Sequence, residues 1–310
     1  MENLNGSGPF KFVKYIKEVS TEYVKNPDYF KEGRPYINGM KHFVIIDSGR
    51  TIAAFKTGQV LTSNQAITNM TSLEALRLDK EMDNLTVHWG GHSGANNILM
   101  NTTKAPFDDP NVRKALHLAL HRQPIIEAFS GGVNLMGYHN PPGFWYSQTQ
   151  EEYDQLPGYR ELNGEKHPDD LAEAQRLIRE AGLPPELKLT LSARNCCGYG
   201  DQAVLIKEHK KNLGWDIDIR TMESSAGFDA FNKGDFQFMV QASSLSNTSP
   251  DAIHSRWVLG AVPRWTGGGR PNFFAVEGVE DLFDKQLHEP DQDKRKVLLT
   301  QLADTLYEGG

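Results

Sequence analysis

The chain has 310 residues, of which 38% are hydrophobic and 24% are charged, and its formal net charge at pH 7 is −7. This composition is that of a globular protein able to bury one or two substantial cores. The acidic balance argues against nucleic acid as a partner, because a phosphate-binding surface needs an excess of Lys and Arg. No stretch of the sequence approaches the ~20 apolar residues of a membrane-spanning helix.

The two cysteines, Cys196 and Cys197, are adjacent. Neighbouring cysteines cannot join distant parts of a fold, and two free thiols in a loop are a better interpretation than a strained vicinal disulfide. Cysteine usage therefore says little about the cellular compartment. The first residues show neither the basic nor the apolar region of a signal peptide, which taken alone would indicate the cytoplasm.

Strand patterns dominate the first fifty residues. Alternation over 9–16 predicts a half-buried strand, and 22–25 predicts its return strand. The nearly all-apolar run 42–46 predicts a buried strand. Ser48 is expected to cap a helix that Gly58 ends.

The middle of the chain begins with helix signals. An acidic N-cap before Pro110 predicts a helix with one apolar face, and Pro124 is expected to begin a second, short helix. The stretch 137–168 is rich in Pro, Gly and Tyr and predicts a long ordered loop. Loops of that length in compact proteins are often functional.

The clearest pattern is strand, helix, strand, helix, strand, which implies an α/β layer with parallel pairing and right-handed crossovers. The five elements are expected over residues 187–193, 202–213, 215–222, 226–232 and 236–240. Further helices are expected over residues 168–181, 279–287 and 291–306.

Three stretches of the chain share an order and spacing with one known family. They are G-S-G-P-F-K-F at 6–12 with N-P-D-Y-F at 26–30, N-T-T-K-A-P-F-D-D at 101–109 with V-R-K-A-L at 112–116, and G-D-F-Q-F at 234–238 leading to S-P-D at 249–251. Together they resemble family 5 of the bacterial extracellular solute-binding proteins.

The resemblance implies an α/β, two-lobed, periplasmic-binding-protein-like (type II) fold with an incomplete first lobe. Residues 1–100 match the C-terminal portion of lobe I and residues 101–310 match most of lobe II, with the hinge crossover near 99–105. The chain then lacks the N-terminal part of lobe I and a C-terminal return segment. Truncation, rather than a cytoplasmic location, would explain the missing signal peptide.

The resemblance also implies a function. The protein is expected to be the substrate-binding component of an ABC importer, a monomer that captures a small solute and delivers it to permease subunits in the membrane. Its location is expected to be periplasmic, or lipid-anchored on the outer side of the cytoplasmic membrane. No catalytic residue, metal or cofactor is expected.

Ligands of α/β layers bind beyond the carboxyl ends of the strands. Here those ends carry Arg194 and Asn195 after the first strand and Ser244 after the third. Arg194 matches an arginine that pairs with the ligand carboxylate in peptide-binding relatives, and a guanidinium suits that task. A structural or solvated arginine is an equally weighted alternative.

Relatives that bind peptides place an aspartate before the D-P-D element to hold the ligand's amino group. The matching position here is Ser246, with Asn247 beside it, and the element itself reads S-P-D. A buried ammonium needs a fixed counter-charge. This departure puts a standard peptide in doubt and makes a neutral, polyol-like or anionic solute more plausible.

The loop before residue 150 supplies the last candidates, Trp145 and Tyr146, whose rings are expected to stack on an apolar face of a ligand. The alternative is that they pack the loop onto lobe II, which we favour slightly for Trp145. His88 and His92 lack neighbours at metal-ligand spacing, so we set a metal site aside.

Two other functions stay open. A solute sensor that signals to a membrane partner without transport has the same sequence features. A hydrolase on a two-lobed α/β scaffold would need a nucleophile with a nearby base, and no Ser, His and Asp set stands out.

Overall fold

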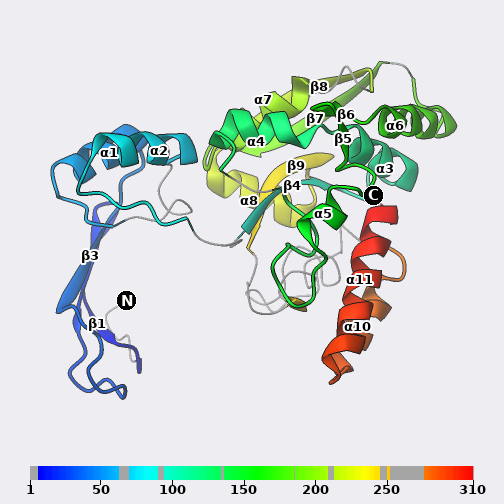
Figure 1. Cartoon of the computed structure of the whole chain (residues 1–310). Helices are drawn as coiled ribbons and strands as arrows, with labels where there is room; N and C mark the ends of the chain where they lie inside the picture. The colour runs from blue at the N-terminus through cyan, green and yellow to red at the C-terminus, as the bar shows by residue number, and fades with distance from the viewer. Residues whose placement is uncertain are drawn as a thin grey trace. The chain divides into compact units, whose positions relative to one another are not determined.

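The computed structural model describes residues 6–62, 70–89, 94–133, 136–184, 186–208, 213–244, 250–251 and 276–309 (Figure 1). The chain divides into two compact units, Met1–Met70 and Thr71–Gly310. The lobe boundary that we predict between residues 100 and 101 stays a prediction.

The first unit holds an antiparallel sheet of three strands in the order β1-β2-β3, followed by helix α1. The two strands expected from alternation are confirmed and form a hairpin. The bounds are β1 Phe10–Ile16, β2 Ser20–Lys25, β3 Gly39–Phe43 and α1 Ser48–Lys56.

Two expectations in this unit are wrong. The run 42–46 is not a buried strand, because β3 ends at Phe43 and the Ile46 side chain beyond it is 78% exposed. Apolar composition alone had indicated burial, but the chain leaves the sheet after Phe43 pairs with Ser20. The cap of α1 is Asp47 rather than Ser48, since the Asp47 carboxylate accepts a hydrogen bond from the Arg50 amide at 2.9 Å.

The sequence motif around Asn26 has a structural task in this unit. The buried Asn26 side chain donates to the Gly8 carbonyl at 2.9 Å, and its oxygen accepts from the Asp28 amide at 3.1 Å. The Lys11 ammonium lies 2.9 Å from the Asp28 carboxylate. These contacts join the two parts of the motif, residues 6–12 and 26–30, across the start of the hairpin.

The second unit is built on a four-stranded sheet in the order β4-β9-β7-β8. The strands β8 and β9 both run parallel to β7, which lies between them, and β4 pairs antiparallel with β9. The expected α/β layer with parallel pairing is therefore confirmed. The strand bounds are β4 Gly94–Met100, β7 Leu187–Arg194, β8 Trp215–Met222 and β9 Phe238–Ser244.

Helices pack on both faces of this sheet, and the second unit contains further helices and a short hairpin. The long loop expected over 137–168 contains α5 and the β5–β6 hairpin. The bounds are α2 Ser72–Glu81, α3 Pro110–Ala119, α4 Arg122–Ser130, α5 Gln150–Tyr153, β5 Glu161–Leu162, β6 Glu165–Lys166, α6 Pro168–Glu180, α7 Tyr199–Glu208, α8 Ser224–Lys233, α10 Val279–His288 and α11 Gln292–Gly309.

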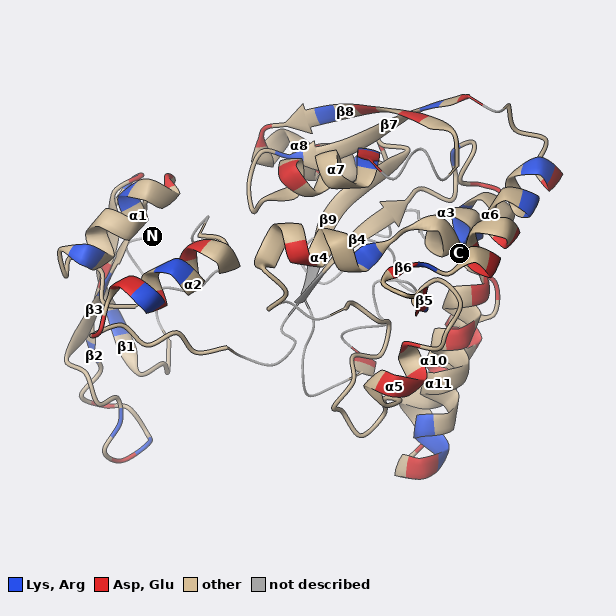
Figure 2. Cartoon of the chain, turned by 45° about the horizontal axis from the view of Figure 1, so that its top comes forward, with Lys and Arg blue, Asp and Glu red and all other residues tan. Residues whose placement is uncertain are grey.

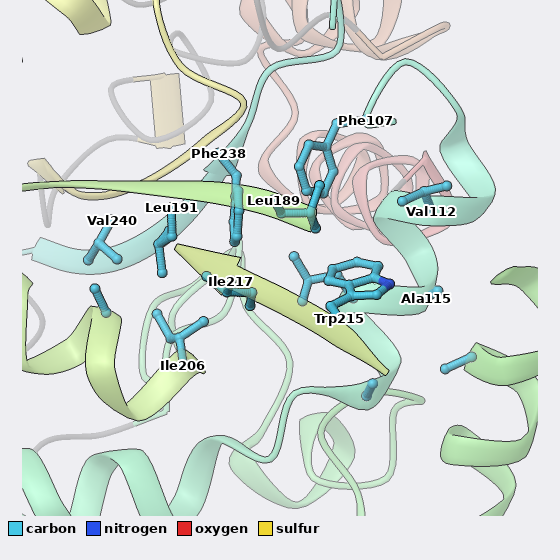
Figure 3. Packing of buried hydrophobic residues seen from close by; sticks show 14 of the residues in the cluster. Phe107, Val112, Ala115, Leu189, Leu191, Ile206, Trp215, Ile217, Phe238 and Val240 are labelled. Atoms are coloured by element: carbon cyan, nitrogen blue, oxygen red, sulfur yellow. The ribbon is translucent and has the colours of Figure 1, made fainter. Parts of the chain in front are cut away.

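The sheet separates two apolar cores. Because side chains alternate along a strand, Phe238 and Val240 of β9 enter one core while Met239 enters the other. The first core contains side chains of α3, α6 and α7, and Figure 3 shows its rings of Phe107, Trp215 and Phe238 near one another. The second core contains the α8 side chains Ala230 and Phe231, so α8 covers the opposite face.

Outward-facing helix surfaces carry charges of both signs. Figure 2 shows acidic and basic residues interspersed along α6, α10 and α11. Several form exposed pairs one turn apart, such as Arg176 with Glu173 and Lys285 with Asp281. The charged groups of these pairs are exposed, so the surfaces that carry them face solvent. Exposed pairs of this kind contribute little to stability. None of the helices that the structure describes combines the length and apolarity needed to cross a membrane.

A cluster of aromatic and basic side chains closes the space between α3, α4, the 137–168 loop and α11. Tyr138 stacks on Tyr153 with ring centroids 4.3 Å apart. The Arg122 guanidinium lies 4.7 Å from the centroid of Tyr159 and donates to Nδ1 of His117 at 3.0 Å. The other His117 ring nitrogen, Nε2, lies 3.1 Å from the Pro157 carbonyl and donates to it in the neutral tautomer.

The cluster holds two neutral histidines, His117 and His139, and the His139 ring lies 4.7 Å from the ring of Tyr307 in α11, centroid to centroid. Burial, and then the Arg122 charge, lower the pKa of His117 well below its usual range and the pKa of His139 to about 4. In the unfolded chain a histidine has a pKa of about 6.5. Between these values the unfolded state binds more protons than the folded state.

Stability is therefore expected to rise with pH from about 4 to about 6.5. Replacing His139 by Gln should reduce the fall in melting temperature between about pH 7.5 and about pH 5, because one of the neutral histidines is gone. Thermal unfolding followed by circular dichroism measures this difference. The exposed His288 provides the control, and a His139→Gln profile that matches the His288→Gln profile would contradict the assignment.

Candidate solute-binding site

Arg194 is the last residue of β7 and lies at the carboxyl edge of the parallel strands. Its side chain is buried and donates three hydrogen bonds. The Nε atom donates to Gln241 of β9 at 3.1 Å, and one terminal nitrogen donates to the Ser224 hydroxyl of α8 at 2.8 Å. The other terminal nitrogen donates to the Tyr199 hydroxyl of α7 at 3.5 Å.

Aromatic rings also hold this guanidinium. Its central carbon lies 4.0 Å from the ring centroid of Phe228 and 5.1 Å from that of Tyr199. Gly227 makes the approach of α8 possible, because a Cβ atom there would lie 2.4 Å from Cγ of Arg194. The Arg194 side chain is therefore fixed in one orientation by three elements, and this orientation is costly to change.

The charge on Arg194 has no acidic partner within the described ranges, where no carboxylate forms an ion pair with it. A guanidinium has five N–H groups, and the three hydrogen bonds above leave two N–H groups without a partner among the residues described. A buried cation needs an anion or further hydrogen bonds to offset its lost hydration. The arrangement is that of a positioned donor for an anionic group.

The structure describes only some of the other residues predicted at this edge. The Asn195 side chain is exposed, and its backbone amide donates to the Met222 carbonyl at 2.8 Å. Ser244 ends β9, paired with Gly94. The predicted Ser246 and Asn247 lie outside the described residues.

Trp145 and Tyr146 make contacts that differ from those of Arg194. Tyr146 is fully buried and packs against Leu299 of α11 and Phe144. Burial raises the pKa of Tyr146 to about 12, and its hydroxyl has no hydrogen-bond partner among the residues described. Trp145 is 36% exposed as a residue, and the Arg295 guanidinium lies 5.8 Å from the centroid of its ring. These contacts favour the packing alternative for both rings, and ligand stacking stays a prediction.

Asp251, the last residue of the S-P-D element, contacts the last two helices. The Asp251 carboxylate accepts from Gln286 of α10 at 3.0 Å and from Arg295 of α11 at 2.7 Å. Arg295 Nε donates in turn to the Gln286 side-chain oxygen at 3.0 Å. The aspartate of this motif therefore ties residues 250–251 to α10 and α11.

The partners of Arg194 show what sequence patterns could and could not find. Sequence patterns did not predict Ser224, Tyr199 or Phe228 as partners of Arg194. These residues lie on α7 and α8, and the periodicity of a helix does not show where the helix packs. One signal was available, since Ser224 and Tyr199 each follow the carboxyl end of a parallel strand, where site residues gather. No group of three or more His, Cys, Asp or Glu side chains in the described ranges is arranged to hold a metal ion.

The sheet and the helices on its two faces form an α/β layer. Solved structures of other proteins share this fold. Over 98% of this chain and 56% of its own, the periplasmic binding protein DppA from Helicobacter pylori, solved with peptide STSA, matches with a TM-score of 0.80 and 22% identity. The murein tripeptide binding protein MppA of Escherichia coli matches over 99% and 57% of the two chains, with a TM-score of 0.80 and 19% identity. The fold is that of the two-lobed periplasmic binding proteins.

The chain belongs to family 5 of the bacterial extracellular solute-binding proteins, because the model of that family's middle region matches residues 1–262. Di/tripeptide-binding protein 1 of Pseudomonas aeruginosa is 28% identical over 313 residues, covering 98% of this chain and 54% of that protein. The oligopeptide-binding protein AppA of Bacillus subtilis is 28% identical over 257 residues, covering 79% and 45%. The chain spans about half the length of these curated relatives.

Proposed function

We propose that this protein is the substrate-binding component of an ABC importer, which captures a small solute outside the cytoplasmic membrane by closure of two lobes about a hinge. Membership of the solute-binding family supports this proposal. The relatives named above bind peptides or are named for peptide binding. The protein has no turnover, acts as a monomer, and hands its solute to permease subunits in the membrane.

The observation that carries the proposed site is the buried Arg194 guanidinium at the carboxyl edge of the sheet. Its fixed orientation and its spare N–H groups suit a carboxylate or similar anion, which accepts two parallel hydrogen bonds from such a fork. Asn195 follows β7, Ser244 ends β9, and Ser246 and Asn247 come next in the sequence. These four residues are proposed to supply polar contacts. With Ser246 in place of an acidic residue, the solute carries an anionic group and no ammonium group at that end.

The proposed location is the periplasm or the outer side of the cytoplasmic membrane, through a lipid anchor. The description of one relative supports a location outside the cytoplasm, since the protein from Helicobacter pylori is a periplasmic binding protein associated with an ABC transporter.

A thermal-shift screen of the complete protein tests the function. The panel contains free dipeptides and tripeptides, N-acylated peptides, opines, organic acids, sugars and metal ions. We expect an acidic solute without a free ammonium group to raise the melting temperature, as binding to the folded state does. Strong stabilisation by free dipeptides would overturn the inference from Ser246, and no stabilisation by any solute would contradict the binding function.

Arg194→Gln is expected to weaken binding of the acidic solute by about 10- to 100-fold, the range for loss of hydrogen bonds to a charged group. Isothermal titration calorimetry of the solute found in the screen measures this change. Arg220→Gln is the matched control, because Arg220 lies on β8 of the same sheet and forms an exposed pair with Asp235. Equal affinities of both variants and the parent protein would remove Arg194 from the site.

A further inference from the structure

The adjacent cysteines lie directly after β7, beside the residues that hold Arg194. Neither sulfur forms a disulfide, and Cys196 is partly buried while Cys197 is exposed. The Cys196 sulfur lies 3.7 Å from the Ser224 hydroxyl oxygen, and that same oxygen accepts a hydrogen bond from Arg194. The dithiol is therefore one contact away from the guanidinium.

The two thiols also lie close to each other. The Cys197 thiol is within hydrogen-bonding reach of the Cys196 thiol and of the Tyr199 hydroxyl, the second group that accepts from Arg194. The backbone is left-handed at Cys197, with φ of 59°, and at Gly198, with φ of 72°. A Cβ atom on Gly198 would lie 2.5 Å from the Phe129 ring, so this turn is held against α4.

We propose that Cys196 and Cys197 are a redox-sensitive pair that closes into a vicinal disulfide on contact with a disulfide oxidant, and that closure loosens the hold of Ser224 and Tyr199 on Arg194. Both sulfurs must turn toward each other to bond, which withdraws them from the two hydroxyl groups. The second part rests on the proposed function, since it makes the solute site respond to redox state. Proteins outside the cytoplasmic membrane meet such oxidants.

The chemistry is two thiol–disulfide exchanges. The exposed Cys197, as thiolate, attacks one sulfur of glutathione disulfide, and the released glutathione thiolate takes up a proton. The Cys196 thiolate then attacks the Cys197 sulfur of this mixed disulfide and releases the second glutathione. The protein dithiol is oxidised by two electrons, glutathione disulfide is reduced to two glutathiones, and the two thiol protons end on them.

The surroundings of Cys197 determine the pH at which its thiol reacts. Burial, and then the neighbouring Cys196, raise the pKa of the Cys197 thiol. Because the thiolate is the nucleophile, the first exchange is expected to accelerate as pH rises.

The test incubates the reduced, complete chain with glutathione disulfide, alkylates the remaining thiols and maps the product by mass spectrometry. The expected product has lost two hydrogens, carries no alkyl group and retains no glutathione. Cys196→Ser is expected to keep a stable glutathione adduct on Cys197, because the resolving thiol is absent. Cys197→Ser is expected to react at least about 10-fold more slowly, because Cys196 is shielded.

Two results would overturn the redox pair: alkylation of both cysteines in the treated parent protein, or a lasting glutathione adduct on it. The coupling to Arg194 is tested separately by hydrogen–deuterium exchange of the reduced and oxidised forms. Faster exchange in the first turns of α7 and α8 after oxidation is expected, and unchanged exchange there would refute the coupling. Neither readout needs a solute, so these failures are distinguishable from a failure of the binding function.

Discussion

Replacing Asp170 by Asn is expected to lower the free energy of unfolding by about 3–5 kcal/mol, the cost of leaving buried charges without their partner. Asp170 is 1% exposed and accepts from Arg160 at 2.9 Å and from the Gly158 amide at 2.7 Å. Its carboxylate also lies 3.2 Å from the buried Lys166 ammonium. Asn keeps the size of the side chain but removes its charge and turns an N–H donor toward other donors.

The size of this loss depends on the protonation state of Lys166. Burial, and then the Arg122 charge, lower the pKa of Lys166 to about 8 even with Asp170 present. Without the carboxylate, its pKa is expected to fall further, so the Asp170→Asn protein should be less destabilised above about pH 8 than at pH 7.

Urea unfolding at neutral pH measures the difference, and the neighbouring residue supplies the control. Asp169 lies in the same first turn of α6, but its side chain is 75% exposed. Asp169→Asn is expected to cost about 0.5 kcal/mol, the range of an exposed charge at a helix start. Similar losses in the two variants would show that Asp170 is not the centre of a buried ion network.

Replacing Asn101 by Ala is expected to cost about 2–4 kcal/mol, because it leaves buried polar groups without hydrogen bonds. Asn101 is fully buried, and its amide group donates to the carbonyls of Gly234 and Phe236 at 3.0 and 3.1 Å. Its side-chain oxygen accepts from the amide and the hydroxyl of Thr103. One side chain thus joins two of the sequence motifs, the segment after β4 and the segment before β9.

The control for this variant is Asn195→Ala, since the Asn195 side chain is exposed at the end of β7. That change is expected to stay within about 0.5 kcal/mol of the parent protein in the same urea titration. Asn101→Asp is expected to be destabilising as well, because it removes the two amide donors. A stable Asn101→Ala protein would mean that water replaces the lost donors, contrary to this account.

Local patterns predicted the α/β layer because each strand and helix of β7 to β9 carries its own periodicity. They also predicted the cap of α3, where Asp109 accepts from the Asn111 amide at 2.8 Å. The helix α2 was missed although its signal was present, since Thr71 and Glu74 form a capping box. The strand β4 was missed because it depends on antiparallel pairing with β9, far along the chain.

The candidate site follows the same division. Arg194 could be predicted from its place at a strand end and from the family resemblance. The contacts of Arg194 with Ser224, Tyr199 and Phe228 could not be predicted, because they depend on how α7 and α8 pack at the sheet edge. For Tyr146 the sequence left ligand stacking and loop packing open. The structure shows the ring buried against α11, which no local pattern could indicate, and ligand stacking stays a prediction.

The most direct test of the account compares the acidic solute found in the screen with its carboxamide, by isothermal titration calorimetry on the complete protein. The two solutes differ only in the charge and acceptor capacity of the group that Arg194 is proposed to bind. We predict that the carboxamide binds at least about 10-fold more weakly, and that Arg194→Gln removes most of this difference. Equal affinity for the acid and the carboxamide would contradict recognition of an anion by Arg194.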